Sequence, residues 1–135
     1  MKTIPTVQKY MTSLPHTIGF DQTLERAQHM MREYGIRHLP ILKGGELVGI
    51  LSDRDLKLIM SFTDVDPKTI AVDEACTPDP YVIKTSASLE EVATYMAEHK
   101  CGSALITENN KLVGIFTEVD ALKALSELLN RELKQ

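Results

Sequence analysis

The sequence predicts an α/β fold built from two copies of one β-α-β-β-α unit. Three observations indicate it: the chain repeats itself at a fixed offset, apolar residues follow helical or strand spacing within each copy, and short turn sequences separate these segments. One copy of about 60 residues would bury only about 60% of its surface and be marginally stable alone. We therefore expect the two copies to pack together by pseudo-two-fold symmetry.

The repeat is clearest around two glycines. ELVGILSDRDLK (46–57) aligns with KLVGIFTEVDAL (111–122), so the offset between the glycines is 114 − 49 = 65 residues. The same offset aligns the rest of the two copies without a gap. Identical pairs include Val7/Val72, Thr12/Thr77, Gly49/Gly114 and Asp55/Asp120. The expected boundaries are 5–62 for the first copy, 63–70 for a polar linker and 71–131 for the second copy.

In the first copy, a short helix precedes an extended segment that ends near Ile18. A helix is expected from about residue 23 to about residue 34, because Leu24, Ala27 and Met31 recur at helical spacing. Gly35 is a typical C-terminal stop for it. HLPIL (38–42) and ELVGIL (46–51) predict two strands joined by the turn residues KGG. A second helix is expected from Ser52 to about residue 62.

The second copy predicts the same elements. An extended segment ends near Ile83, and a helix follows whose start, SLEE (88–91), has the pattern of a capping box. SALIT (103–107) and KLVGIF (111–116) predict the two strands, and the last helix runs from Thr117 to about residue 131. We expect a leucine stripe on that helix to be core, or alternatively a dimer face: Leu122, Leu125, Leu128 and Leu129.

Composition and motifs exclude several function classes. The net charge of −4, with 15 basic and 19 acidic residues, argues against a nucleic-acid-binding protein. No run approaches the roughly 18 apolar residues of a membrane span, and the N-terminus lacks the apolar block of a secretory signal. We therefore expect a cytoplasmic protein with no membrane partner. No nucleophile, base and orienting residue can be assembled from the motifs, which indicates that the protein is not an enzyme.

The cysteines and histidines give no metal motif. Cys76 and Cys101 form no CxxC pair, and the four histidines lack metal-ligand spacing, so we expect neither a disulfide framework nor a zinc site. In the repeat, the cysteines align with Met11 and Ile36. This exchange with apolar residues indicates small hydrophobic side chains in the core.

The repeated stretches resemble the CBS domain. The residues that carry the resemblance are TLERAQHMMREYGIRHLPIL and LVGILSDRDL in the first copy, and SLEEVATYMAEHKCGSALIT and LVGIFTEVDAL in the second. The resemblance covers about residues 5 to 125 and is that of a tandem pair, a Bateman module. It implies a stand-alone regulatory module that binds an adenosine-containing ligand, AMP, ADP, ATP or S-adenosylmethionine, in clefts between the copies. It also implies a homodimer, no required cofactor, and an unknown protein partner that receives the signal.

The family's ligand motif is glycine–apolar–x–Ser/Thr–x–x–Asp, which here spans 49–55 and 114–120. The resemblance implies that Ser52 and Thr117 face phosphate or ribose, and that Asp55 and Asp120 accept hydrogen bonds from ribose hydroxyls. A helix N-terminus suits a phosphate because its backbone N–H groups are unpaired. Ser-x-x-Asp is also close to a capping box, so a purely structural role stays open. Asp instead of the usual Glu in both copies favours the ligand role.

Three basic side chains occur near the first motif only. Arg37, His38 and Arg54 are candidates for phosphate contact, and the alternative is that they are solvated surface residues. The second copy has Gly102, Ser103 and Val119 at the aligned positions, so we expect two unequal sites.

Apolar residues are expected to hold the base. By family likeness the candidates are Ile18, Ile83 and Pro40, with backbone groups of Thr17 at the adenine edge; the alternative for the three apolar residues is core packing. The competing function is a structural or dimerisation module whose clefts bind no nucleotide.

Overall fold

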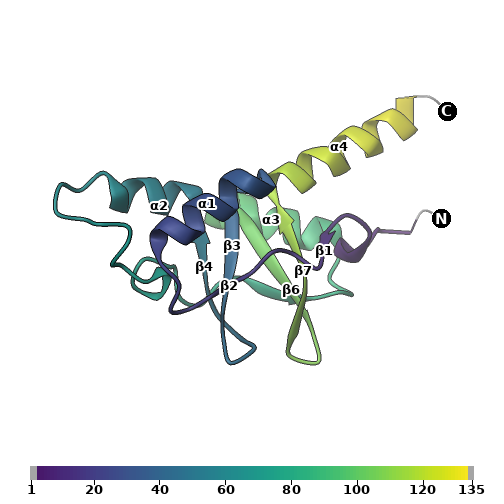
Figure 1. Cartoon of the computed structure of the whole chain (residues 1–135). Coiled ribbons are helices and arrows are strands. Elements are labelled where there is room, and N and C mark those ends of the chain that lie inside the picture. The colour runs from purple at the N-terminus through teal and green to yellow at the C-terminus, as the bar shows by residue number, and fades with distance from the viewer. Residues whose placement is uncertain (1–2, 134–135) are drawn as a thin grey trace. The chain divides into compact units, whose positions relative to one another are not determined.

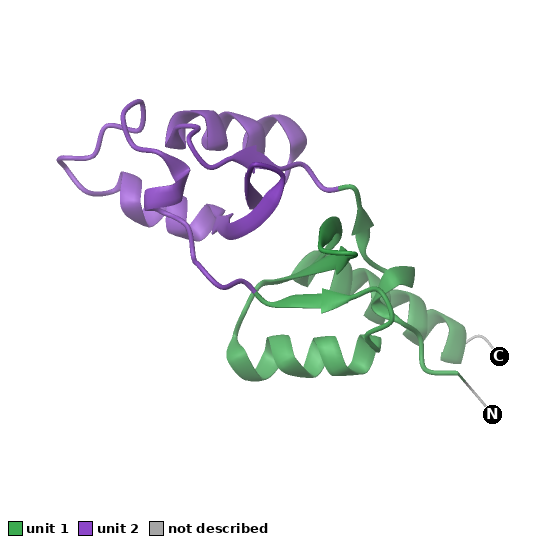
Figure 2. Cartoon of the chain, turned by 90° about the horizontal axis from the view of Figure 1, so that it is seen from below, with its two compact units in different colours: residues 1–14, 81–135 green, residues 15–80 purple. Residues whose placement is uncertain are grey.

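A computed structural model describes residues 3–133 of the chain. These residues form two compact units, which Figure 2 distinguishes by colour. One unit consists of residues 15–80, and the other combines the chain up to residue 14 with the chain from residue 81 onward. Each unit has its own sheet and its own hydrophobic cluster.

The 15–80 unit contains a three-stranded sheet in the order β2-β3-β4. β2 runs parallel to β3, and β3 pairs antiparallel with β4 through a hairpin whose turn lies at the far end from α1 and α2 (Figure 1). The elements are β2 (Ile18–Gly19), α1 (Leu24–Tyr34), β3 (His38–Lys43), β4 (Glu46–Ser52), α2 (Asp53–Met60) and the 3-10 helix η2 (Val72–Glu74).

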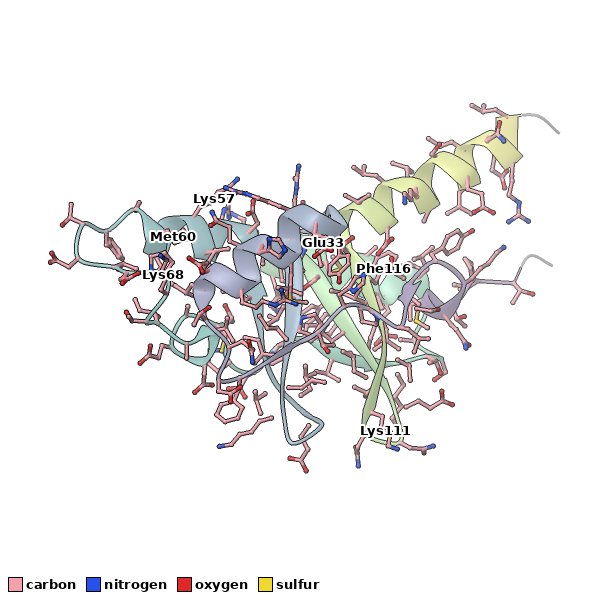
Figure 3. All side chains as sticks on the ribbon, in the orientation of Figure 1. Glu33, Lys57, Met60, Lys68, Lys111 and Phe116 are labelled. Atoms are coloured by element: carbon pink, nitrogen blue, oxygen red, sulfur yellow. The ribbon has the colours of Figure 1, made fainter. Side chains whose placement is uncertain are left out.

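The other unit contains a four-stranded sheet in the order β1-β7-β6-β5. Lys111 lies at the turn of its β6–β7 hairpin and Phe116 near the opposite end of β7 (Figure 3). The elements are the 3-10 helix η1 (Val7–Lys9), β1 (Thr12–Ser13), β5 (Val82–Lys84), α3 (Leu89–His99), β6 (Ser103–Glu108), β7 (Lys111–Thr117) and α4 (Glu118–Leu133). The predicted α/β fold and the β-α-β-β-α order of both copies are confirmed.

The two repeats exchange their leading segments, which are residues 3–14 of the first repeat and residues 71–80 of the second. Val7, from the start of the first repeat, donates its N–H to the carbonyl of Ala87 over 2.8 Å and is fully buried in the cluster of the second. Val72 makes the equivalent bond to Gln22, also 2.8 Å, and is fully buried in the cluster of the first. The boundaries expected from the repeat therefore differ from those of the compact units, which divide after residues 14 and 80.

Residues 63–70 lie within one unit. The carbonyls of Pro67 and Ile70 accept hydrogen bonds from the N–H groups of Glu25 and Leu24 at the start of α1. These two bonds satisfy donors that a helix N-terminus leaves unpaired. The segment expected as a linker between the copies thus joins α2 to η2 inside the 15–80 unit.

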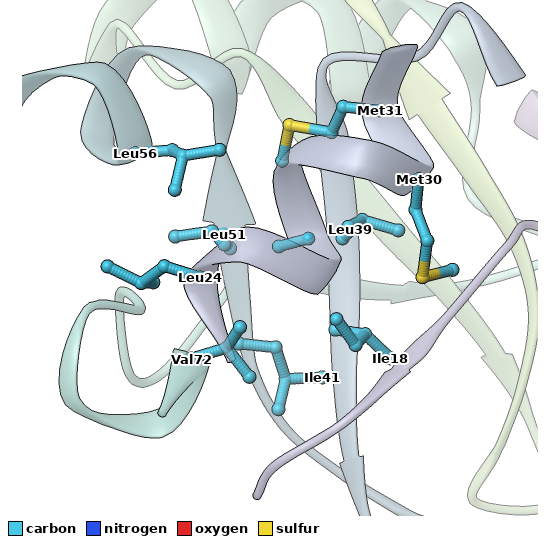
Figure 4. Packing of buried hydrophobic residues seen from close by; sticks show 10 residues of the cluster. Ile18, Leu24, Met30, Met31, Leu39, Ile41, Leu51, Leu56 and Val72 are labelled. Carbon is cyan, nitrogen blue, oxygen red and sulfur yellow. The ribbon is translucent and has the colours of Figure 1, made fainter. Parts of the chain in front are cut away.

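The core of the 15–80 unit lies where α1, the strands and η2 meet (Figure 4). Leu24, Ala27 and Met31 of α1 are buried, as their helical spacing predicted. They pack in one cluster with Leu39 of β3 and Leu51 of β4, which are fully buried. Burying one such side chain contributes about 1.5–3 kcal/mol, so this stripe explains why α1 forms here.

The leucine stripe of α4 is divided between two faces. Ala124 is buried, and Leu128 packs on the hydrophobic cluster. Leu122, Leu125 and Leu129 are 65%, 52% and 51% exposed, so their expected place in the core is wrong. Residues four apart share a helix face, and α4 turns the face of Ala124 and Leu128 toward the sheet.

Candidate functional site

The first candidate site is the junction of β4 and α2. Ser52 ends β4 in an extended conformation, and its Oγ accepts the N–H of Asp55 at 3.0 Å. Ser52 is therefore the N-cap of α2, so a structural role for this motif residue is confirmed. Asp53, beside it, forms an ion pair of 3.0 Å with Lys57 one turn along.

The second candidate site is the junction of β7 and α4, where more hydrogen bonds hold the start of the helix. Asp120 Oδ2 accepts the N–H of Thr117 at 3.0 Å and its hydroxyl at 3.2 Å. Thr117 Oγ1 in turn accepts the N–H of Asp120 at 3.4 Å. These reciprocal bonds form a capping box in which the acid is Asp, so Asp in place of Glu does not argue against a capping role here.

Two threonines from the exchanged leading segments reach the aspartates. Thr12 Oγ1 donates toward Asp120, 3.1 Å from Oδ1 and 3.3 Å from Oδ2. Thr77 Oγ1 donates to Asp55 Oδ2 over a longer distance of 3.4 Å. Sequence reasoning did not single out these threonines as site residues. The available signal was that Thr12 and Thr77 are identical at the repeat offset.

The motif glycines let the leading segments approach the strands. A methyl group at Gly49 would lie 2.8 Å from Cys76 Sγ and 3.0 Å from the Thr77 carbonyl oxygen. At Gly114, a methyl group would meet the side chain of Met11. Ile50 and Thr77 exchange backbone hydrogen bonds of 2.9 and 3.1 Å beside Gly49. A glycine is therefore needed for close approach, not for a special turn.

The basic residues gather at the end of the β3–β4 hairpin where α2 begins. The Arg37 carbonyl accepts the N–H of Asp53 at 2.7 Å, and His38 is the strand partner of Ser52. Arg37 and Arg54 are exposed, and His38 is half-buried. Backbone contacts thus bring Arg37 and His38 beside the start of α2, and Arg54 lies in the first turn of that helix.

The second repeat has the same backbone geometry without the basic side chains. The carbonyl of Gly102 accepts the N–H of Glu118 at 3.2 Å, which reproduces the bond between Arg37 and Asp53. Ser103 is the strand partner of Thr117. The two junctions therefore differ in charge and not in backbone path.

The residues expected to hold the base have different burial. Ile18 is 4% exposed and Pro40 is fully buried, and Ile18 belongs to the hydrophobic cluster of its unit. Thr17 and Ile83 are half-buried. Core packing thus accounts for Ile18 and Pro40, whereas Thr17 and Ile83 keep surface that a ligand can reach.

The thiols and titratable clusters add no metal site. Within residues 3–133, no group of three or more His, Cys, Asp or Glu side chains is placed to hold a metal ion. Cys76 and Cys101 are free and half-buried. Burial, followed by the charge of Asp73, raises the pKa of the Cys76 thiol, so it is a poor nucleophile near neutral pH. None of the described helices is long and apolar enough to cross a membrane.

Comparison with known proteins agrees with this geometry. The model of the CBS domain family matches residues 7–61 and 72–127. Hypoxic response protein 1 of Mycobacterium tuberculosis is 33% identical over 111 residues, which are 82% of this chain and 78% of that protein.

Two solved structures extend the comparison to the fold. A Vibrio cholerae protein assigned to acetoin utilization, AcuB, is 31% identical with a TM-score of 0.86, and 98% of each chain is covered. The protein CBSX2, solved in complex with AMP, is 27% identical with a TM-score of 0.81; 92% of this chain and 98% of that chain are covered.

Proposed function

Because the chain belongs to the CBS domain family, we propose that it is a regulatory ligand-sensing module that binds an adenosine-containing ligand, acts in the cytoplasm and signals to a partner protein. The observation that carries the proposal is the β4–α2 junction, where a capped helix N-terminus, exposed Arg37 and Arg54 and the half-buried carboxylate of Asp55 occur together. The AMP complex of CBSX2 supports the ligand class. The proposal includes no catalytic step and no cofactor.

The candidate residues match different parts of such a ligand. Arg37, His38 and Arg54 are the candidate phosphate contacts, since guanidinium groups bind phosphate oxygens in a bidentate manner. Asp55 is the candidate acceptor for ribose hydroxyls, the role that carboxylates have in dinucleotide folds. Half-buried Thr17 and Ile83 are the candidate base contacts, each in its own unit. Ile18 and Pro40, which were also expected to hold the base, are buried in the core of the 15–80 unit.

Titration calorimetry with AMP, ATP and S-adenosylmethionine tests the proposal. We expect heat of binding and a rise in melting temperature with at least one of them, since a ligand that binds only the folded state stabilises it. Arg54→Ala should weaken binding of the nucleotide more than binding of the uncharged nucleoside adenosine, because the substitution removes a proposed phosphate contact. Lys57→Ala, one turn away, is the matched control. The absence of heat and of a thermal shift with all three ligands would contradict a nucleotide-binding function.

Homodimerisation is a second candidate function, and the outer face of α4 favours it. Leu122, Leu125 and Leu129 expose much of their apolar surface along one side of the helix. Contiguous exposed apolar surface is typical of protein contacts. Sedimentation should therefore show a dimer that Leu125→Glu together with Leu129→Glu converts to a monomer. Ser126→Glu and Asn130→Glu on the same helix are the control, and a wild-type monomer at all concentrations would contradict the proposal.

A further inference from the structure

The two motif aspartates occupy different hydrogen-bonding environments. Asp120 is 7% exposed, and both of its carboxylate oxygens accept hydrogen bonds, from the hydroxyls of Thr12 and Thr117 and from the Thr117 N–H. Asp55 is half-buried. The Thr77 hydroxyl donates to the Asp55 carboxylate on Oδ2, at the longer distance of 3.4 Å.

The two carboxylates therefore differ in how readily they can accept hydrogen bonds from a ligand. An ionised carboxylate offers about four acceptor positions. At Asp120 most are already used, and a ribose would have to displace buried hydrogen bonds whose loss is costly. At Asp55, the bond from Thr77 to Oδ2 is longer, the side chain is less buried than that of Asp120, and the exposed Arg54 is the preceding residue. A ligand hydroxyl can therefore bind Asp55 without breaking the cap of α2, which uses Ser52 Oγ and the Asp55 N–H.

The partners of Asp120 indicate what it does instead. Thr12 belongs to β1, which comes from the other sequence repeat and pairs antiparallel with β7 over only two residues, Thr12 and Ser13. So short a strand is marginally stable on its own. The Thr12–Asp120 hydrogen bonds join β1 to the first turn of α4, and the Leu14 N–H bonds to the Val113 carbonyl at 3.0 Å beside them. Asp120 thus connects three elements: β1, β7 and α4.

We propose that the repeated aspartates differ in function: Asp120 with Thr12 is a latch that holds the exchanged N-terminal segment on its unit, whereas Asp55 keeps the ligand role proposed above. The inference about Asp55 rests on the proposed function. The inference about the latch depends only on the hydrogen bonds of Asp120. The chain therefore has one ligand carboxylate, although the motif occurs twice.

Hydrogen exchange and AMP titration on matched variants test both parts. Asp120→Asn and the milder Thr12→Val should each speed exchange of the amides in residues 12–14 by about tenfold, since each removes charge-assisted hydrogen bonds. Their effects should be non-additive in the double variant, because they break the same contact. Asp55→Asn should leave that exchange unchanged and raise the AMP Kd about tenfold or more. Thr12→Val should leave the Kd within about twofold.

The outcomes separate the two parts. An AMP Kd raised equally by Asp120→Asn and Asp55→Asn, with unchanged exchange at residues 12–14, overturns the division of function. Failure of the wild-type chain to bind AMP, ATP or S-adenosylmethionine overturns the proposed function and the role of Asp55. In that case the exchange rates and the double variant still decide whether Asp120 is a latch. If Asp120→Asn fails to fold, Thr12→Val gives the same exchange readout.

Discussion

At the residue scale, the two motif glycines have the same role, whereas the two motif aspartates do not. The sequence predicts that Gly49 and Gly114 are equivalent, and both do allow a leading segment to approach. The difference between Asp55 and Asp120 was not predictable in the same way, because it depends on how far each threonine lies from its carboxylate. Such distances follow from tertiary packing and not from the spacing of residues along the chain.

The two motif glycines should differ in their tolerance of a methyl group. Gly49→Ala places Cβ against the Cys76 sulfur and a backbone carbonyl, which cannot move independently. We expect a loss of about 1–3 kcal/mol in the free energy of unfolding, as for other overpacked sites. Gly114→Ala should cost less, since Met11 is a flexible side chain that can rearrange.

Urea denaturation measures both changes. Gly19→Ala is the control, because its nearest contact, 3.3 Å from the side-chain oxygen of the exposed Asp21, can be relieved by side-chain rotation. A Gly49→Ala protein as stable as the Gly19→Ala protein would show that η2 and the residues after it do not press against β4.

At the scale of elements, most of the pattern was predictable. Helical spacing and a terminal glycine predicted α1, which begins at Leu24 and ends at Tyr34. The turn residues between the apolar runs predicted both hairpins. The core interpretation of the α4 leucine stripe was wrong for Leu122, Leu125 and Leu129, and its alternative, a dimer face, stays a prediction. The four leucines occupy two helix faces, and spacing alone does not say which face meets a sheet.

The ends of α1 and α3 give a prediction from within the repeat. Gly35 and Lys100 are equivalent positions, and both have left-handed backbone conformations, with φ of 64° and 53°. Glycine adopts this conformation without a Cβ penalty, whereas lysine does not. Lys100→Gly should therefore stabilise the protein by up to about 1 kcal/mol, because relief of a left-handed conformation that costs a non-glycine residue roughly 1–2 kcal/mol exceeds the entropy that glycine adds to the unfolded chain. Gly35→Ala should destabilise the protein by about 1 kcal/mol or more.

Thermal and urea unfolding of the two variants measure whether each substitution raises or lowers the free energy of unfolding. Glu98→Gly, two residues earlier and inside α3, is the matched control, and it should destabilise the protein by about 1 kcal/mol because glycine is a poor helix residue. A destabilising Lys100→Gly would indicate that the lysine side chain contributes more than its backbone strain costs.

At the scale of the whole molecule, the exchange of leading segments could not be predicted from the sequence. The 65-residue offset aligns Val7 with Val72, but it holds equally whether each valine packs on its own repeat or on the other one. The choice depends on the path of the chain in space. In the structure, Val72 is buried in the core of the first repeat and Val7 in the core of the second. A fragment cut at the boundary of a sequence repeat therefore lacks a buried core residue.

Two fragments of similar length test this organisation. Residues 15–80 form a compact unit that retains η2, the bond from Val72 to Gln22 and the Thr77–Asp55 contact. Residues 1–70 contain all of α1 to α2 but lack Val72, which is fully buried in that core. Removing a buried apolar side chain of this size costs about 1.5–3 kcal/mol, a large share of the stability of a small unit.

We therefore expect the 15–80 fragment to have dispersed amide NMR signals and a cooperative thermal transition, and the 1–70 fragment to have neither. Since units of this size are marginal, 15–80 with Val72→Ala is the matched control, and its transition should lie well below that of the unaltered fragment. A 1–70 fragment as cooperative as the 15–80 fragment would mean that residues 71–80 add nothing to the core. The N-terminal segment would then be able to substitute for them, which the identity of Val7 and Val72 permits but the observed packing does not use.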